Sequence, residues 1–499
     1  MNKLTHIKIL KKVGVVACLF LLSFSVNAID LIWKFDPELQ KAYNFVFTLQ
    51  PENANEILRK SKGNELHKLY LKSLNETIHI LITEDHASFP QIDQNFKERI
   101  KYLEGLPETA ETLFLQAELS LQRGFCYLNL NQELNAVFAI RKAYQLTSDC
   151  LKKYPNFIPI KKTSGVIQVM VGSVPEKYSW FMSLLGMKGS VTTGQKQLSE
   201  LRLSKSSLNM EASILFFTVK GFINQEFAAA AEGINQSLKD QPNNKLLFFI
   251  GVNMLVKDAR SEEALALIHQ IDNNPNGLPM HYIDYLRGEI LLQKGEYQKS
   301  IEAFDYFVKN FPSQSFKKDS YFKISLCYWL MGDTRSAKAN FEKAKIIGSD
   351  KAEPDRYAAN QLEDANFPNK KLLKVRFSTD GGYYKEATTM LSSVTLSELT
   401  TPKDQTEYYY RKARLAHRTG EIAAAKVFYQ QSIDMTRDNP WYFGANSALN
   451  LGYIAKEQKN YDAARKYFQM ALDSPKHEYK NSIDSKARTE LQLLGEAKV

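Results

Sequence analysis

The segment GEYQKSIEAF at residues 295–304 and the segment GDTRSAKANF at residues 332–341 carry the same types of residue at the same spacing. Each opens with a glycine and has a small side chain five residues later, at Ser300 and Ala337, followed after four more residues by a phenylalanine. The second segment follows the first at a distance of 37 residues. A pattern that recurs at such a period indicates an array of one structural unit.

Two further segments extend the pattern toward the C-terminus. Residues 421–429 place a small residue and an aromatic residue at Ala425 and Tyr429, and residues 460–468 repeat this arrangement 39 residues later. A small residue also recurs in the segment before each copy, at Gly288, Ser325, Ala413 and Gly452. A helical hairpin of about 34 residues cannot bury its apolar stripe alone, so we expect these small residues to let neighbouring helices approach closely.

The pattern resembles the tetratricopeptide repeat. The resemblance implies an all-α fold, a right-handed superhelical solenoid of helical hairpins, in which large side chains fill the space between successive units; here these are Phe304, Phe341, Tyr429 and Phe468. Weaker copies precede the strong ones, one lies at 124–143, and a degenerate copy at 368–395 contains Gly381 and Gly382. We therefore predict a signal peptide at 1–28, an N-terminal helical domain with a repeat-like hairpin at 29–155, an irregular helical linker at 156–210 and a repeat array at 211–499.

The first 28 residues have the composition of a secretory signal. Four lysines precede an apolar stretch at 13–24, and Ala28 ends a small-residue cleavage pattern. We expect an exported protein in the periplasm or cell envelope of a Gram-negative bacterium. An alternative is lipoprotein processing at Cys18. The rest of the chain lacks any run of about 20 apolar residues, the length that spans a bilayer.

Composition excludes several classes of protein. With 44% apolar residues, the 499-residue chain is neither disordered nor collagen-like. Without the four lysines of the signal, its formal net charge falls from +10 to +6, a weakly basic balance that does not indicate a nucleic-acid-binding surface. Of the three remaining cysteines, Cys126 and Cys150 either pair across two helices or are buried as small apolar groups. No CxxC, HExxH or histidine cluster occurs, so we predict no metal, no cofactor and no catalytic residue.

Residues 156–200 interrupt the repeats. Ser173 and Glu176 predict a capping box that starts a helix after Gly172. The segment resembles the tetratricopeptide-repeat-thirty-nine and Iml-two family, and departs from it at Val174 and Ser190; the matching positions are Gly165, Ser173, Pro175, Leu184, Leu185, Gly186, Gly189, the stretch 194–198 and the Asp-Gly-Gly-Tyr at 380–383. The resemblance implies a non-enzymatic repeat scaffold, and some members of that family associate with membranes or lipid bodies.

The same segment supports two structural interpretations. Its apolar stretches at 166–171 and 180–185 are flanked by lysines, which is typical of a helical segment lying on a membrane surface. Alternatively, the two stretches pack against each other as a hairpin inside the protein. An enzyme or carrier site at this segment is a third possibility, but no spacing of nucleophile, base or paired carboxylates selects it.

We predict that binding occurs on the concave side of the array, which the first helix of each hairpin lines. The candidates are residues that we expect to be exposed about one turn apart on those helices, mostly aromatic and basic side chains, because such residues anchor interfaces: Tyr282, Tyr285, Phe322, Trp329, Tyr410, Arg414, Arg418, Tyr453 and Lys456, with Glu289, Leu326 and Asn446 beside them. These residues suit an extended protein segment that carries carboxylates. The alternative is that Tyr410 and Tyr453 are half-buried packing residues and that the charges belong to a solvated face.

Overall fold

A computed structural model describes residues 33–174, 179–364 and 366–496, and these residues form helices and connections without a β-strand. The predicted signal peptide at 1–28, with Cys18, lies outside the described residues, as do Pro175 and Glu176 of the predicted capping box. The predicted all-α solenoid of helical hairpins is confirmed.

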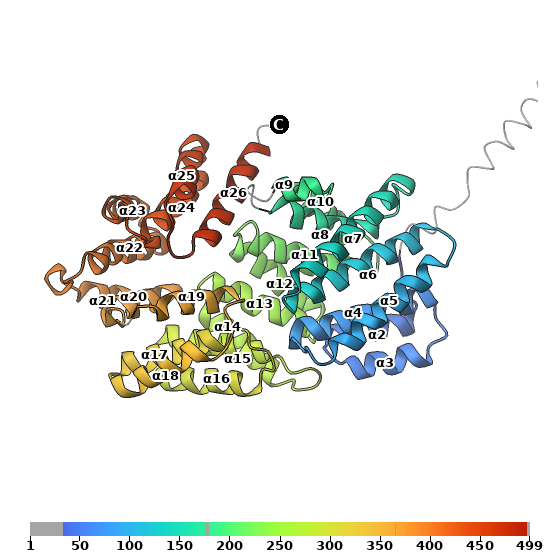
Figure 1. Ribbon diagram of the computed structural model, residues 1–499, viewed down its shortest axis with the longest axis horizontal. Coiled ribbons are helices and arrows are strands. Elements are labelled where there is room, and N and C mark those ends of the chain that lie inside the picture. Colours follow the sequence, from blue (N-terminus) through green and yellow to red (C-terminus); the bar gives the residue numbers. More distant parts are fainter. Residues whose placement is uncertain (1–32, 175–178, 365, 497–499) are drawn as a thin grey trace, which may run out of the picture.

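The helices follow one another through short connections (Figure 1). Their bounds are α2 Pro37–Phe47, α3 Pro51–Lys60, α4 Glu65–Thr83, α5 Phe89–Glu104, α6 Ala110–Asn129, α7 Glu133–Lys153, α8 Ile160–Gly172, α9 Ser179–Leu184, α10 Val191–Arg202, α11 Asn209–Phe222, α12 Phe227–Asp240, α13 Lys245–Lys257, α14 Ser261–Asp272, α15 His281–Lys294, α16 Tyr297–Asn310, α17 Lys317–Met331, α18 Thr334–Ile346, α19 Glu353–Leu362, α20 Lys370–Asp380, α21 Tyr384–Ser392, the short 3-10 helix η2 Leu396–Glu398, α22 Pro402–Arg418, α23 Ile422–Thr436, α24 Tyr442–Glu457, α25 Tyr461–Asp473 and α26 Lys480–Glu496.

The small and large residues of the repeat pattern meet inside the hairpins. Gly288 of α15 lies so close to Phe304 of α16 that a Cβ atom there would be 2.8 Å from the ring, and one at Gly452 of α24 would be 2.5 Å from Phe468 of α25. Ala425 is completely buried, like its counterparts at 300, 337 and 464. The recurring small residues therefore set the distance between paired helices, as predicted.

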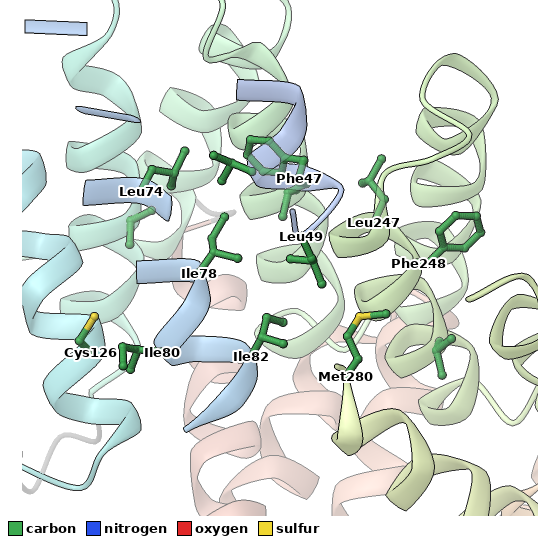
Figure 2. Packing of buried hydrophobic residues seen from close by; sticks show 14 of the residues in the cluster. Phe47, Leu49, Leu74, Ile78, Ile80, Ile82, Cys126, Leu247, Phe248 and Met280 are labelled. Atoms are coloured by element: carbon green, nitrogen blue, oxygen red, sulfur yellow. The ribbon is translucent and has the colours of Figure 1, made fainter. Parts of the chain in front are cut away.

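The front helices and the first part of the array share one apolar core. In Figure 2, Phe47 and Leu49 lie between the α4 residue Ile78 and the array residues Leu247 and Met280. The amide of Leu278 also donates to the carbonyl oxygen of Leu49 at 2.7 Å. A second core, formed by α22 to α26, holds the C-terminal hairpins together.

Glycines allow α8 and α10 to cross closely. A Cβ atom at Gly165 would lie 2.8 Å from Leu198, and one at Gly194 would overlap the carbonyl oxygen of Gly165. The partner of α8 is thus α10, rather than the 180–185 stretch of the predicted hairpin. Along the described part of the chain, no helix combines the length and apolar character needed to cross a membrane.

The hairpin of α20 and α21 interrupts the regular order of the array. It packs against α15, and Tyr383 donates a hydrogen bond to Glu262 of α14 at 2.8 Å. Farther along, the chain curves back, so that α26 lies near the α9–α10 region (Figure 1). Val171 of α8 and Leu491 of α26 line one pocket of about 790 Å³, so these two helices lie near each other although they are far apart in the sequence.

Candidate functional site

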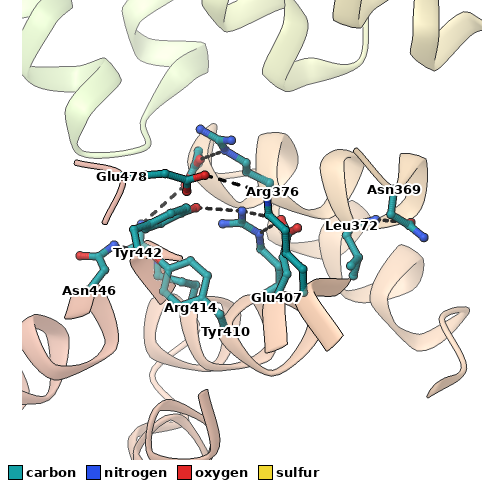
Figure 3. Close-up of polar contacts among 12 residues, drawn as sticks. Asn369, Leu372, Arg376, Glu407, Tyr410, Arg414, Tyr442, Asn446 and Glu478 are labelled. Atoms are coloured by element: carbon teal, nitrogen blue, oxygen red, sulfur yellow. Dashed lines mark hydrogen bonds and ion pairs between the residues drawn. The ribbon is translucent and has the colours of Figure 1, made fainter. Parts of the chain in front are cut away.

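Arginine and tyrosine side chains from α20, α22 and α24 form a polar cluster in the C-terminal half of the array (Figure 3). Arg411 is buried, pairs with Glu407 one turn earlier at 2.6 Å, and donates to the hydroxyl of Tyr442 at 3.0 Å. Because this arginine is covered and fully paired, it stabilises the crossing of α22 and α24 and is not free to bind a ligand.

Arg376 of α20 joins two segments that are far apart in sequence. Its guanidinium donates to the hydroxyl of Tyr357 at 3.0 Å and to that of Tyr479 at 3.4 Å, and the two tyrosine rings stack with centroids 4.4 Å apart. Glu478, beside Tyr479, accepts a hydrogen bond from Gln361 at 3.1 Å. These contacts hold α19 against the connection that leads into α26.

Arg414 and Arg418 lie one turn apart on α22 but differ in their surroundings. Arg414 is half-buried, donates to Asn450 at 3.3 Å and lies 3.6 Å from the carboxylate of Asp380. Arg418 is exposed. Burial, together with the charges of both arginines, lowers the pKa of His417 to about 4, so this histidine is neutral at physiological pH.

The prediction of exposed aromatic anchors on α15 and α17 is wrong for two residues. Tyr285 is buried and donates to Asp319 at 2.7 Å, and Phe322 is also buried, as is the neighbouring Leu326. Tyr282 is half-buried and stacks on Tyr285 with ring centroids 5.4 Å apart. These side chains fill the interior between successive hairpins because the first helices turn them toward their own second helices.

Trp329 contacts a later part of the chain. Its ring stacks on Phe367 at 4.9 Å between centroids, and its Nε1 donates to the carbonyl oxygen of Pro368 at 3.0 Å. The segment that leads into α20 therefore occupies this surface. Glu289, another candidate, is engaged by Lys323 of α17.

The last two units also bury or pair most of their candidates. Tyr410 is buried, which corrects its predicted exposure, and its hydroxyl accepts a hydrogen bond from Asn446 at 2.5 Å. Tyr453 is half-buried, with its ring 5.5 Å from that of Phe468. Lys456 pairs with the buried carboxylate of Glu490 at 2.5 Å. Tyr410 and Tyr453 thus match the alternative in which they are packing residues.

The sequence analysis did not select two lysines that we assign to the inner face of the array. We use the term inner face for the side of the first helices that is turned toward the centre of curvature, together with the adjoining side of α26. Lys257, at the end of α13, is exposed, and Lys486 of α26 is half-buried. Burial and the charges of Lys257 and Arg414 lower the pKa of Lys486 to about 8, while Glu353 opposes this shift. No local motif marks either lysine, because α13 and α26 are far apart in the sequence.

Among the described residues, no group of three or more histidine, cysteine, aspartate or glutamate side chains is placed to hold a metal ion. Cys126 and Cys150 are both buried and free, as is Cys327. Burial raises the pKa of each of these thiols to about 12, which keeps them protonated and poorly nucleophilic.

A family profile described as Tetratricopeptide repeat matches residues 318–345, 406–439 and 445–476. These segments coincide with the hairpins α17–α18, α22–α23 and α24–α25. The chain contains tetratricopeptide repeats in these three segments. The α15–α16 hairpin lies outside the matched segments but has the same close approach of a glycine to a phenylalanine as the matched α24–α25 hairpin.

Several solved structures are similar to this chain at low sequence identity. The apo form of the quorum sensor NprR from B. thuringiensis is 12% identical, with 73% of this chain and 98% of that chain covered and a TM-score of 0.40. The human IFIT1 dimer with PPP-AAAA is 12% identical, with 89% and 96% covered and a TM-score of 0.35. The APC/C hetero-tetramer Cut9-Hcn1 is 15% identical, with 92% and 83% covered and a TM-score of 0.29.

No curated protein matches the sequence significantly. The resemblance of residues 156–200 to the tetratricopeptide-repeat-thirty-nine and Iml-two family stays a prediction. Its glycines nevertheless have a physical role here, since Gly165 and Gly194 permit the close crossing of α8 and α10.

Proposed function

We propose that this protein is a non-enzymatic scaffold that holds an extended segment of a partner protein along the inner face of its repeats. The observation that carries the proposal is the exposed Arg418, which lies on the first helix of a matched repeat beside the half-buried Arg414. Stacked hairpins of this kind create extended concave surfaces for binding. Arginine side chains are frequent anchors at such interfaces.

We further propose that the protein acts after export, at the envelope of a Gram-negative bacterium. The basic head, the apolar stretch at 13–24 and the cleavage pattern ending at Ala28 support this location. Sequencing of the mature N-terminus tests the proposal: cleavage before Ile29 is the expected result. A lipid-modified Cys18 supports the alternative processing, and an intact Met1 in a cytoplasmic fraction contradicts export.

Crosslinking of intact envelopes followed by mass spectrometry tests the scaffold function. We expect a protein partner whose crosslinks fall on the inner face, near α22 and α26. The variant Arg418→Glu reverses one exposed charge there and is expected to reduce partner recovery. Lys338→Glu on α18 is the matched control, because Lys338 is also exposed but lies on the second helix of its hairpin. Equal recovery with both variants would contradict binding along the inner face.

Membrane association through α9 is a second candidate function. Leu184 at the end of α9 is 73% exposed, which favours contact with an apolar phase. However, Val166 and Val169 of α8 are buried in the protein core, so the apolar surface for a membrane is smaller than the sequence suggested. Flotation of the mature protein with liposomes distinguishes membrane association from the scaffold function. Recovery only in the soluble fraction contradicts membrane association through α9.

A further inference from the structure

A pocket of about 250 Å³ lies where the first described residues of the chain meet the start of α11. The amide of Phe35 donates to the hydroxyl of Ser207 at 3.0 Å, and the amide of Ser207 donates to the carbonyl oxygen of Trp33 at 2.8 Å. These hydrogen bonds hold two walls of the pocket together. We call it the α11 pocket. The residues that line it include Lys34, Tyr43, Lys205, Ser207 and Met210.

The charged side chains that line the α11 pocket are positive. Lys34 and Lys205 are both exposed, and neither has an ion pair or a hydrogen bond with a residue that the structure describes. None of the described lining residues is acidic. The carboxylate of Asp36, two residues after Lys34, caps α2 by accepting from the amides of Glu38 and Leu39. An anion in the pocket would therefore meet two lysine charges and no carboxylate in the wall.

The N-terminus of α11 adds backbone donors to the pocket. This helix has 14 residues, and its N-cap residue, Leu208, offers no side-chain acceptor to the first turn. Met210 lines the pocket, and its amide has no acceptor among the described residues. Free amides and the helix dipole make such an N-terminus attractive to anions. A helix N-terminus alone does not define a site, so a second and independent observation is needed.

Tyr43 of α2 provides that observation. It lines the pocket and is 1% exposed, yet its hydroxyl has no hydrogen-bond partner among the described residues. The amide and the carboxylate of Glu211 are near enough to act on the pKa of Tyr43, but neither reaches the hydroxyl in hydrogen-bond geometry. That carboxylate is held instead by Lys162 at 2.5 Å and by Tyr70 at 2.6 Å. Because a buried hydroxyl without a partner is unfavourable, an acceptor bound beside Tyr43 would stabilise it.

We propose that the α11 pocket binds a phosphate group, carried either by inorganic phosphate or by a small phosphomonoester. Lys34 and Lys205 provide the opposite charge. The amide of Met210 and the hydroxyls of Tyr43 and Ser207 donate hydrogen bonds to the phosphate oxygens. The Ser207 hydroxyl can do so because its oxygen accepts from Phe35 while its own proton stays available. The pocket lies outside the inner face, so the proposal does not depend on the scaffold function.

The number and the origin of the donors favour phosphate over a carboxylate. They come from three parts of the chain: the segment at 33–43, the connection at 203–208 and the first turn of α11. A phosphate group presents three strong acceptor oxygens in different directions, whereas a carboxylate presents two in one plane. The pocket is smaller than the about 300–1,000 Å³ of sites that hold drug-sized ligands. The ligand is therefore a phosphate with at most a small group attached.

Isothermal titration of the full mature chain with inorganic phosphate and, separately, with glycerol 3-phosphate tests the proposal. Sodium acetate at the same ionic strength is the control anion. We expect both phosphates to bind and acetate not to bind. Tighter binding of glycerol 3-phosphate supports an esterified phosphate as the ligand, and tighter binding of inorganic phosphate supports the free ion. Lys34→Gln and Lys205→Gln should each weaken binding about tenfold, the effect of one charge-assisted contact.

Two further variants separate the site from general effects of charge and folding. Tyr43→Phe removes only the hydroxyl, so phosphate binding should weaken about tenfold. Its melting temperature in phosphate-free buffer should equal or exceed that of the parent, because the hydroxyl has no partner in the protein. Lys196→Gln removes an exposed cation of α10 that does not line the pocket, and it should bind phosphate like the parent. Circular dichroism melts verify that each variant is folded.

Several outcomes overturn the inference. It fails if neither phosphate binds, if acetate binds as tightly as phosphate, or if the double variant Lys34→Gln and Lys205→Gln binds phosphate as the parent does. It also fails if Tyr43→Phe lowers the melting temperature in phosphate-free buffer and leaves the affinity for phosphate unchanged, because the hydroxyl would then have a purely structural role. The crosslinking experiment on the inner face tests the scaffold function separately.

Discussion

Gly382 lies directly against the carbonyl oxygen of Ala259, so the turn between α20 and α21 touches the turn between α13 and α14. A Cβ atom at Gly382 would overlap that oxygen, and its φ of +84° is in the left-handed region, which side chains rarely adopt. Tyr383 strengthens the contact through its hydrogen bond to Glu262. The glycine thus allows two hairpins that are not consecutive to dock, and this docking shapes the inner face.

The substitution Gly382→Ala is expected to destabilise the protein by about 3 kcal/mol or more, since it adds backbone strain and a clash with Ala259. Gly420→Ala is the matched control, because Gly420 has the same φ of +84° and open space around its Cβ position. It should lose only about 1 kcal/mol, the cost of the strain alone. Chemical denaturation of both variants measures the difference. Equal losses of unfolding free energy in the two variants would show that the α20–α21 turn does not contact the α13–α14 turn.

The repeat register predicts the effect of bulk at a small position. Ala425 is completely buried between helices, so Ala425→Arg both overpacks the site, at about 1–3 kcal/mol, and buries an unpaired charge at a higher cost. We expect the C-terminal core of α22 to α26 to unfold, seen as loss of helical signal and rapid proteolysis of that region. Ala423→Arg, at an exposed position of the same helix, should leave the melt unchanged. An unchanged melt for Ala425→Arg would mean that the register is wrong.

A buried ionic group ties the front helices to α8 and α11. Lys162 is 4% exposed and lies 2.8 Å from Glu118 of α6 and 2.5 Å from Glu211 of α11, and Tyr70 of α4 donates to Glu211 at 2.6 Å. The lysine is the only countercharge for two covered carboxylates among the contacts described here. It therefore fixes the relative positions of four helices.

Replacing Lys162 should lower the free energy of unfolding far more than replacing the adjacent Lys161. Lys162→Met leaves two unpaired buried carboxylates and is expected to cost about 3–5 kcal/mol. Lys161→Met, which removes a half-exposed pair with Glu200, should cost at most about 1 kcal/mol. Adding Glu118→Gln and Glu211→Gln to Lys162→Met should restore part of the loss in denaturation experiments. If all three variants have the same stability, the ionic group of Lys162, Glu118 and Glu211 does not stabilise the packing of these helices.

The sequence predicts what is local and periodic in this fold. The close contact of Gly288 with Phe304 recurs at Gly452 and Phe468, and a comparison of the repeat units predicts it without a structure. By contrast, the burial of Tyr285 and the cover over Trp329 depend on how successive hairpins pack and on where the segment before α20 returns. Such long-range contacts do not produce a repeating pattern in the sequence.

The candidate site was predictable only in part for the same reason. The repeat register places Arg418 on a first helix, and the structure shows that this residue is exposed at the end of α22. Lys257 and Lys486 lie on helices that are far apart in the sequence, and the charge of Lys257 acts on Lys486 only in the folded chain. The Asp-Gly-Gly-Tyr at 380–383 stood out through its resemblance to a family, and the structure gives it a cause, since Gly382 and Tyr383 make the docking contact.

His67 makes the stability of the front helices depend on pH. It is 8% exposed and packs against the rings of Trp33 and Phe35, with centroids 4.3 Å and 5.3 Å away. Burial lowers its pKa to about 4, while the charge of Asp36 opposes this shift. In the unfolded chain the pKa is near 6.5, so the unfolded state binds the proton more readily.

The stabilisation linked to His67 is therefore complete above about pH 6.5 and is lost as the pH falls to about 4, a change of about 3 kcal/mol. His67→Phe should remove this contribution, so the difference in unfolding free energy between parent and variant should change by about that amount between pH 7 and pH 4. His86→Phe, at an exposed position, should leave the profile of the parent unchanged. Because His417 also has a pKa lowered to about 4, the variant will still lose some stability in acid. Parallel profiles for the parent and His67→Phe would show that His67 is protonated equally in the folded and unfolded chains.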